Sequence, residues 1–402
     1  MTATATHGPL AIHGGTPVRT APFGGWPQWG EEEERALLGA LRSGTWGSLD
    51  GTLVKRLEQE FAAFQGARYG VSCVNGTLAL SVALKAVGVE PGDEVLVPPY
   101  TFIATASAAL MIGAIPVFVD VDLETLLIDP ERIDAAVTPR TRAIIPVHHA
   151  GSPADMDGVM AAAQRHDLRV IEDAAQAHGA AWRGTPVGAI GDVGTFSFQS
   201  SKAINAGEGG MMVTNDPAVE ELLWSYRNVG RRKDGEWYEH VRLGWNLRLT
   251  EFQAAVLLEQ MRRFPAQVAH RSESAAYLSS RLEAIPGVVP LRVPDGVTAH
   301  TWYSYHFRWL GEHDGGLPKL AFSAALKAEG IPNFHGYVPL NRNAAVRAEI
   351  ARLGGPEPAA CPAAERAADH EVIMLSLPIL MGSRADLDQV ADAITKVAAA
   401  RA

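Results

Sequence analysis

Three short segments of the sequence carry groups that could do chemistry. The first is Asn75-Gly76-Thr77, between the apolar run VSCV and the helix-prone stretch LALSVALKAV. A Gly-Thr turn that opens a helix offers free backbone N–H groups, a hydroxyl and the positive end of the helix dipole, which suits a phosphate. An ordinary helix N-cap accounts for the same residues, so this segment alone leaves both interpretations open.

The second segment ends in a carboxylate. Asp173 closes the stretch LRVIED, whose apolar β-branched residues predict a buried strand. A carboxylate at the carboxyl end of a strand faces the crevice where α/β sheets bind ligands. A capping or ion-paired aspartate at the following turn is the alternative, and the segment alone does not decide between them.

The third segment contains one lysine. Lys202 ends the stretch TFSFQSSK and is followed by the turn Gly207-Glu208-Gly209-Gly210. A solvated loop lysine is the ordinary interpretation of such a residue. A Walker A loop is excluded, because the glycine that it requires six residues before the lysine is replaced by Phe196.

Together, the three segments match the needs of one cofactor, pyridoxal 5′-phosphate. This molecule has a phosphate, a pyridine nitrogen that must stay protonated and an aldehyde that a lysine holds. A helix N-terminus suits the phosphate, and a buried aspartate raises the pKa of the ring nitrogen and keeps it protonated. Lys202 would hold the aldehyde, for which its amine must be neutral.

The sequence predicts strands that alternate with helices around these segments. This alternation indicates an α/β fold with a mainly parallel central sheet flanked by helices, which would bring the segments together. Strands are predicted at 71–74, 95–97, 115–119, 143–147, 168–171, 195–198, 211–214 and 303–309. Helices are predicted from residue 31, at 53–66, 78–87, 104–112 and 155–165, and from Thr250, a plausible N-cap.

The composition shift after Phe264 divides the chain. We expect an N-terminal arm at 1–30, a large cofactor-binding domain at 31–264 and a smaller α+β C-terminal domain at 265–402. The chain has 402 residues, 47% hydrophobic and 20% charged, which is enough apolar material for a large core and excludes disorder or a coiled coil.

The charge and the cysteine content indicate which binding partners and which cellular compartment to expect. The net charge is −10 and no basic run of five residues occurs, so a nucleic-acid partner is not expected. The two cysteines form no CxxC pair, and the N-terminus lacks the features of a signal peptide. The uncharged stretch 95–119 contains three prolines and fits strand–helix–strand better than a membrane helix. We therefore expect a cytoplasmic protein without a membrane partner.

A metal site is not expected. His148 and His149 follow the strand AIIPV, but no third ligand stands at metal spacing and no HExxH is present. His149 is a candidate for the wall of the substrate pocket, and a hydrogen-bonded structural histidine is the favoured alternative.

At this point the sequence resembles a known family, the DegT/StrS-type aminotransferases. These are fold-type I pyridoxal-phosphate enzymes that aminate keto sugars and keto cyclitols. The resemblance runs from Gly14 to Pro378. Its motifs are Asn75-Gly76-Thr77-x-Ala-Leu, Pro99-Tyr100-Thr101-Phe102-x-Ala-Thr, Glu172-Asp173-Ala-Ala-Gln176-Ala-His178-Gly179, Ser197-Phe198-x-x-x-Lys202 and Trp245-Asn246-x-Arg248-x-x-Glu251-x-Gln253-Ala254.

The resemblance implies a role for each matching residue. Lys202 would hold the cofactor covalently and move the proton, Asp173 would bind the ring nitrogen and Gln176 the phenolic oxygen. Phe102 would stack on the ring. Gly76, Thr77 and Ser197 would bind the phosphate, and Asn246 would reach it from a neighbouring subunit. An active site of this type implies a homodimer with shared active sites.

One stretch departs from the family pattern. Many members that act on sugar nucleotides have Pro-Leu-His where this chain has Pro339-Leu340-Asn341, preceded by Tyr337. With Ser201-Lys202, this version is similar to the glutamine-dependent keto-cyclitol (scyllo-inosose type) enzymes and to aminohydroxybenzoate synthases. Tyr337, Asn341, His149 and His178 are the candidate substrate contacts, although packing between the domains explains Tyr337 equally well.

The function expected from these observations is amino transfer from L-glutamine or L-glutamate to a cyclic ketone in secondary-metabolite (antibiotic) biosynthesis. The alternatives are a nucleotide-linked keto-sugar aminotransferase, an aminohydroxybenzoate-synthase-like enzyme and a non-catalytic regulator with the same fold. A related dehydratase would have histidine in place of Lys202. A nicotinamide dehydrogenase would need a GxGxxG after its first strand, which this chain lacks.

Overall fold

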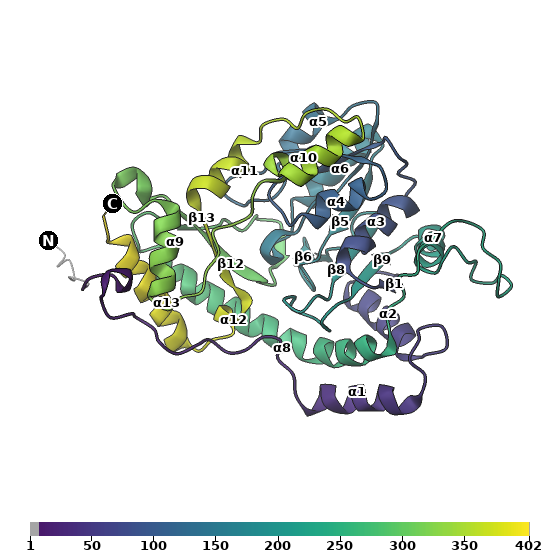
Figure 1. Cartoon of the computed structure of the whole chain (residues 1–402), viewed down its shortest axis with the longest axis horizontal. Helices are drawn as coiled ribbons and strands as arrows, with labels where there is room; N and C mark the ends of the chain where they lie inside the picture. Colours follow the sequence, from purple (N-terminus) through teal and green to yellow (C-terminus); the bar gives the residue numbers. More distant parts are fainter. Residues whose placement is uncertain (1–7, 402) are drawn as a thin grey trace.

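The computed structural model describes residues 8–401. Residues 1–7, the beginning of the expected N-terminal arm, and Ala402, the end of the expected C-terminal domain, lie outside the described residues. Figure 1 shows a large α/β body and a smaller C-terminal part, with one long helix running along both.

A seven-stranded sheet forms the centre of the larger part. The seven strands predicted between residues 71 and 214 are its seven strands. In spatial order they are β1 (Tyr69–Cys73), β9 (Gly210–Thr214), β8 (Val193–Ser197), β5 (Arg169–Asp173), β4 (Thr141–Ile144), β2 (Glu94–Val97) and β3 (Ile115–Phe118). From β8 to β3 all neighbours are parallel, whereas β9 is antiparallel to both β1 and β8. The prediction of a mainly parallel sheet is confirmed.

The alternation of side chains along each strand explains why helices cover both faces. Successive residues of a strand point to opposite faces. In β2, Val95 and Val97 belong to one buried cluster, and Leu96 between them belongs to another. Both faces are therefore apolar and both need a cover, which accounts for the continuous hydrophobic runs in the sequence.

The helices divide between the two faces according to these clusters. One face is covered by α3 (Gly76–Ala86), α4 (Ala104–Leu110), α7 (Pro217–Arg227), α10 (Ala344–Arg352) and α11 (Pro362–Arg366). The other is covered by α2 (Leu53–Phe64), α5 (Ile133–Ala136), α6 (Met156–His166) and the first half of α8 (Glu251–Leu282).

The C-terminal part has its own core. Its antiparallel sheet runs in the order β10 (Val288–Pro290), β12 (Ser304–Trp309) and β13 (Val372–Ser376). The second half of α8 packs there with α9 (Lys319–Ala328), α12 (Leu377–Leu380) and α13 (Arg384–Ala398). A third small sheet contains β11 (Val297–Ala299), β6 (Ala181–Trp182) and β7 (Thr185–Pro186).

Helix α8 links the two cores. Thr250 caps it, as predicted. Its hydroxyl accepts a hydrogen bond from the Gln253 amide, and the Gln253 side chain accepts one from the Thr250 amide. Leu257 near its start packs with α2, and Leu278 near its end packs with β12. The domain limit proposed at residue 264 lies inside this helix, and the limits themselves stay a prediction.

The N-terminal arm reaches back over the C-terminal part. Between residues 8 and 30 it forms only one short 3₁₀ turn, Ala11–His13, before α1 (Glu31–Ser43) begins with four acidic residues. Arg19 of the arm pairs with Asp386 at 2.6 Å, and Figure 1 shows the arm beside α13. In the described part of the chain no helix is long and apolar enough to span a bilayer.

Candidate active site

The N-terminus of α3 presents free backbone donors. Asn75 caps this helix, since its Oδ1 accepts from the Leu78 amide at 2.9 Å. Among the hydrogen bonds of residues 8–401, the amides of Gly76 and Thr77 have no acceptor. A Cβ atom on Gly76 would lie 2.8 Å from Cβ of Ser197, so only glycine allows β8 to approach this closely. The two amides, the Thr77 hydroxyl and Ser197 thus form a cradle for an anion.

Asp173 stands at the carboxyl end of β5 with its carboxylate buried, 6% exposed. Thr105 of α4 donates to its Oδ2 at 2.8 Å, and the Ala175 amide donates to its Oδ1 at 3.2 Å. Burial raises the pKa of Asp173, and the Thr105 hydrogen bond and the Lys202 charge oppose that shift. No cationic side chain donates a hydrogen bond to this carboxylate in the described residues, so a protonated ring nitrogen would form an ion pair with it.

Lys202 follows β8 in a tight turn. Its amide donates to the Gln199 carbonyl at 2.8 Å. Its carbonyl accepts from Asn205 Nδ2 at 2.9 Å and from Trp26 Nε1 at 3.2 Å. The Nζ atom lies 4.8 Å from the ring centroid of Tyr303 and forms no ion pair within residues 8–401. The turn is therefore fixed by its backbone, and the amine is left available for a ligand.

Two further side chains border the space between these groups. Gln176 accepts from the Ala150 amide through Oε1 at 2.8 Å, which turns its Nε2 toward the Tyr337 hydroxyl at 3.4 Å. Phe102 is 55% exposed and lies at the opening. Burial raises the pKa of Tyr337, so its hydroxyl stays protonated.

One cavity of about 600 Å³ joins these groups. Seven of the predicted residues line it, namely Gly76, Thr77, Phe102, Asp173, Gln176, Ser197 and Lys202, together with the substrate candidate Tyr337. It provides an anion cradle, a buried carboxylate, an available amine and an aromatic wall. This set fits pyridoxal phosphate in charge and in chemistry.

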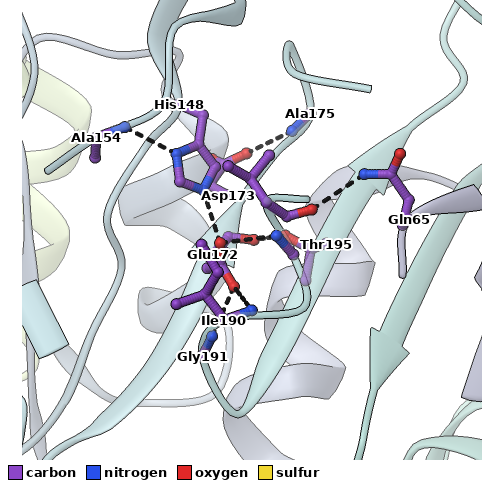
Figure 2. A network of polar contacts seen from close by, with 11 residues as sticks. Gln65, His148, Ala154, Glu172, Asp173, Ala175, Ile190, Gly191 and Thr195 are labelled. Carbon is purple, nitrogen blue, oxygen red and sulfur yellow. Dashed lines mark hydrogen bonds and ion pairs between the residues drawn. The ribbon is translucent and has the colours of Figure 1, made fainter. Parts of the chain in front are cut away.

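Beneath the cavity, Glu172 and His148 form a buried network that Figure 2 shows. His148 Nδ1 accepts from the Ala154 amide at 3.0 Å, so its Nε2 carries the proton and donates to Glu172 at 3.0 Å. Glu172 also accepts from the amides of Gly188, Ile190 and Gly191. These two side chains hold the segment beside β5 and do not reach the cavity. In the described chain no three acidic, histidine or cysteine residues gather as a metal site would require.

Four candidates do not line this cavity. His178 donates through Nε2 to the Ser197 carbonyl at 3.0 Å within a cluster of phenylalanine rings, and burial lowers its pKa to about 3. Asn341 donates to Glu365 at 2.8 Å. His149 lies behind Tyr337 with ring centroids 5.8 Å apart, and burial lowers its pKa to about 4. Asn246 is exposed on the segment that follows α7.

Three neighbours of the cofactor groups were not identified from the sequence. Thr105 is the last residue of the Pro99–Thr105 motif, so a signal existed, although its bond to Asp173 did not follow from it. Tyr303, under the Lys202 amine, was placed only at the start of a predicted strand. Trp26 belongs to the arm and carried no signal.

This fold and this pocket define a class, the fold-type I aminotransferases that use pyridoxal phosphate. The model of the DegT/DnrJ/EryC1/StrS aminotransferase family matches residues 27–395. The chain therefore belongs to that family, and it is an aminotransferase.

Known proteins similar to this chain carry related activities in their names. An L-glutamine:2-deoxy-scyllo-inosose aminotransferase from Streptoalloteichus tenebrarius is 38% identical over 96% of this chain and 97% of its own. A 3-amino-5-hydroxybenzoate synthase from Amycolatopsis mediterranei is 38% identical over 95% and 99%. A crystal structure of 3-amino-5-hydroxybenzoic acid synthase superposes with a TM-score of 0.88 and 37% identity, covering 94% of this chain and 99% of the other.

Proposed function

We propose that this protein binds pyridoxal phosphate and transfers an amino group from L-glutamine or L-glutamate to a cyclic ketone, a keto-cyclitol of the scyllo-inosose type. The donor exchanges its α-amino group and α-hydrogen for an oxo group. The ketone exchanges its oxo group for an amino group and a hydrogen, so atoms and electrons balance. The name of the Streptoalloteichus relative supports glutamine as donor and a keto-cyclitol as acceptor.

The observation that carries the proposal is the meeting of Lys202, Asp173 and the α3 amides in one cavity. When bound, the cofactor supplies an electron sink for the carbon that bears the nitrogen. Asp173 would keep the ring nitrogen protonated, the α3 N-terminus with Ser197 would bind the phosphate, and Gln176 would bind the phenolic oxygen. The Lys202 amine takes the proton from the substrate carbon and returns it during the transfer.

The test combines absorption with turnover. Purified protein is reconstituted with the cofactor and its visible spectrum is recorded. L-glutamine, or L-glutamate in a parallel sample, is then added, followed by 2-deoxy-scyllo-inosose. We expect the band to change with the donor and to return with the ketone. Lys202→Ala should show neither change. A wild-type protein that shows no band after reconstitution, or no response to either donor, would overturn the proposal.

We also propose a homodimer in which Asn246 completes the site of the partner. Large apolar side chains are exposed on the chain segment just before Asn246 and on α1. They include Trp237 (76% exposed), Tyr238 and Leu243 (96%), and Leu37 and Leu41 on α1. Such a patch indicates a protein interface, and a second copy of the chain is the occupant that a shared site requires. We also propose that the protein is cytoplasmic, because its two cysteines form no disulfide framework.

A second candidate is 3-amino-5-hydroxybenzoate synthesis. It is favoured by the TM-score of 0.88 with the synthase and by 38% identity to the Amycolatopsis enzyme. Formation of 3-amino-5-hydroxybenzoate by the purified protein, in the absence of keto-cyclitol amination, would favour this activity over the first.

A further inference from the structure

A second hollow opens beside the cofactor cavity. Its volume is about 530 Å³, and it shares Ser201, Tyr303 and Tyr337 with the first. Since the Lys202 amine lies over the Tyr303 ring, the junction of the two hollows is next to the reacting amine. A molecule in the second hollow would therefore present one of its atoms to Lys202.

The wall of this hollow is mostly apolar, but it presents hydroxyl groups and has no charged side chain. Six of its thirteen residues bear hydroxyls, two more are Trp26 and Phe334, and the other five are glycine, proline or aliphatic. Five of the six hydroxyls have a hydrogen-bond partner in the protein. Ser304 Oγ lies 2.8 Å from His306 Nε2, and Ser201 Oγ lies 3.1 Å from the Tyr303 hydroxyl. Each hydroxyl can both donate and accept, which matches the hydroxyls of a polyol.

Trp26 brings the N-terminal arm into this wall. Its indole Nε1 donates to the carbonyl of Lys202 at 3.2 Å, across 176 residues of sequence. The same ring lines the hollow, and Phe334 lies in the wall with 59% of its surface exposed. The arm thus both supports the turn that carries the lysine and supplies an apolar surface for the C–H bonds of a ring.

We propose that this hollow is the subsite for the acceptor ring, and that it selects a polyhydroxylated ring ketone without an anionic substituent, with Trp26 and Phe334 as specificity-determining residues. This assignment rests on the proposed function, because it names the ligand of the same active site. Beyond that function, it identifies the residues that contact the acceptor and the kinds of acceptor that they exclude.

The absence of cations in the wall gives the selection its physical cause. A buried phosphate or carboxylate needs a positive partner, and no arginine, lysine or histidine lines the hollow in residues 8–401. A nucleotide diphosphate that entered this hollow would lose hydrating water, and no cationic side chain of the wall would offset that cost. The carboxylate of the amino-acid donor is excluded for the same reason, so the donor places that group elsewhere.

The test measures the two half-reactions separately in the holoenzyme. Trp26→Phe keeps an aromatic ring but removes the N–H, and Phe334→Ala removes the ring. We expect each to raise the KM for 2-deoxy-scyllo-inosose about tenfold. Phe334 does not contact the Lys202 turn, so for Phe334→Ala the rate of the glutamine half-reaction should stay within about twofold of wild type. A nucleotide-diphosphate-linked keto sugar should show a kcat/KM about a hundredfold lower than the free ring ketone in the wild type.

Trp46→Phe is the matched control. It removes an indole hydrogen bond to a backbone carbonyl (Leu41, 3.1 Å) at a residue that lines neither hollow, so the KM should not change. Wild-type protein that aminates no ring ketone would overturn the proposed function. A working enzyme whose KM is unmoved by both variants, or that uses the nucleotide-linked ketone equally well, would overturn the subsite alone.

Discussion

Thr105 and Asp173 are joined by a hydrogen bond of 2.8 Å from Oγ1 to Oδ2, which ties the first turn of α4 to the carboxyl end of β5. The threonine is fully buried, and no charged side chain donates to the carboxylate in the described structure. A neutral hydroxyl and one backbone amide therefore hold Asp173 in place and leave its carboxylate without a hydrogen-bonded cation, ready for a cationic ring.

Replacing Thr105 by valine should weaken cofactor binding. Valine keeps the shape of threonine but removes the donor, so the charged form of Asp173 loses its main stabilising contact. Since hydrogen bonds to charged groups contribute about 1.5–3 kcal/mol, we expect cofactor affinity to fall about tenfold or more. Titration of the cofactor-free protein measures this. Thr105→Ser restores the hydroxyl and should bind nearly as wild type, and equal affinity of the valine and serine variants would contradict the prediction.

Cofactor affinity should also depend on pH through Asp173. Burial raises its pKa, so the carboxylate takes up a proton at a higher pH than an ordinary aspartate does. As the pH falls through this raised pKa, the partner of the ring nitrogen loses its charge and affinity should drop. Asp173→Asn should bind weakly at every pH and lack this transition.

The raised pKa of Asp173 also makes the folding stability depend on pH. A carboxyl group whose pKa is raised on folding stabilises the protein below its unfolded pKa, and this contribution is lost as the pH rises through the folded pKa. Cofactor-free Asp173→Asn should therefore unfold at a higher temperature than the wild type near neutral pH, and at nearly the same temperature in acid. A lower melting temperature for the variant at neutral pH would contradict this.

Glu172→Ala should destabilise the protein strongly without touching the cavity. The substitution leaves the buried Gly188 amide and the His148 N–H without their acceptor, together with the partly buried amides of Ile190 and Gly191 that Figure 2 shows. With about 1–3 kcal/mol for each unsatisfied buried group, a loss of at least about 3 kcal/mol is expected in urea unfolding. Glu60→Ala removes an exposed ion pair with Arg56 and should cost less than about 1 kcal/mol.

Mixing two inactive variants tests the shared site. If Asn246 serves the partner's cavity, Lys202→Ala and Asn246→Ala are each inactive, but a hybrid dimer has one complete site. Random mixing makes half of the dimers hybrid, so about a quarter of the wild-type turnover should return. No recovery, with hybrid dimers present by mass spectrometry, would place Asn246 in its own subunit's site or outside any site.

Much of the site followed from local patterns. Strand ends, a helix N-terminus and a Gly-rich turn are short-range features, and residues at the carboxyl ends of parallel strands meet at one edge of the sheet. For that reason Gly76, Asp173 and Ser197 could be placed together from the sequence, and the cavity contains all three. Single residues without such a context were less informative. His178 and Asn341 carried no strand-end signal of their own, and each is bonded away from the cavity.

The sequence by itself determined the α/β fold, the order of the strands along the chain, the class of enzyme and seven of the residues that line the cavity. Only the tertiary structure decided what borders them: Trp26 on the Lys202 carbonyl, Tyr303 under its amine and the uncharged hollow beside them. Those contacts join segments about 100 or more residues apart, across the two cores. They depend on how the arm and the C-terminal part close over the sheet, and side-chain packing at such range leaves no periodic pattern in the sequence.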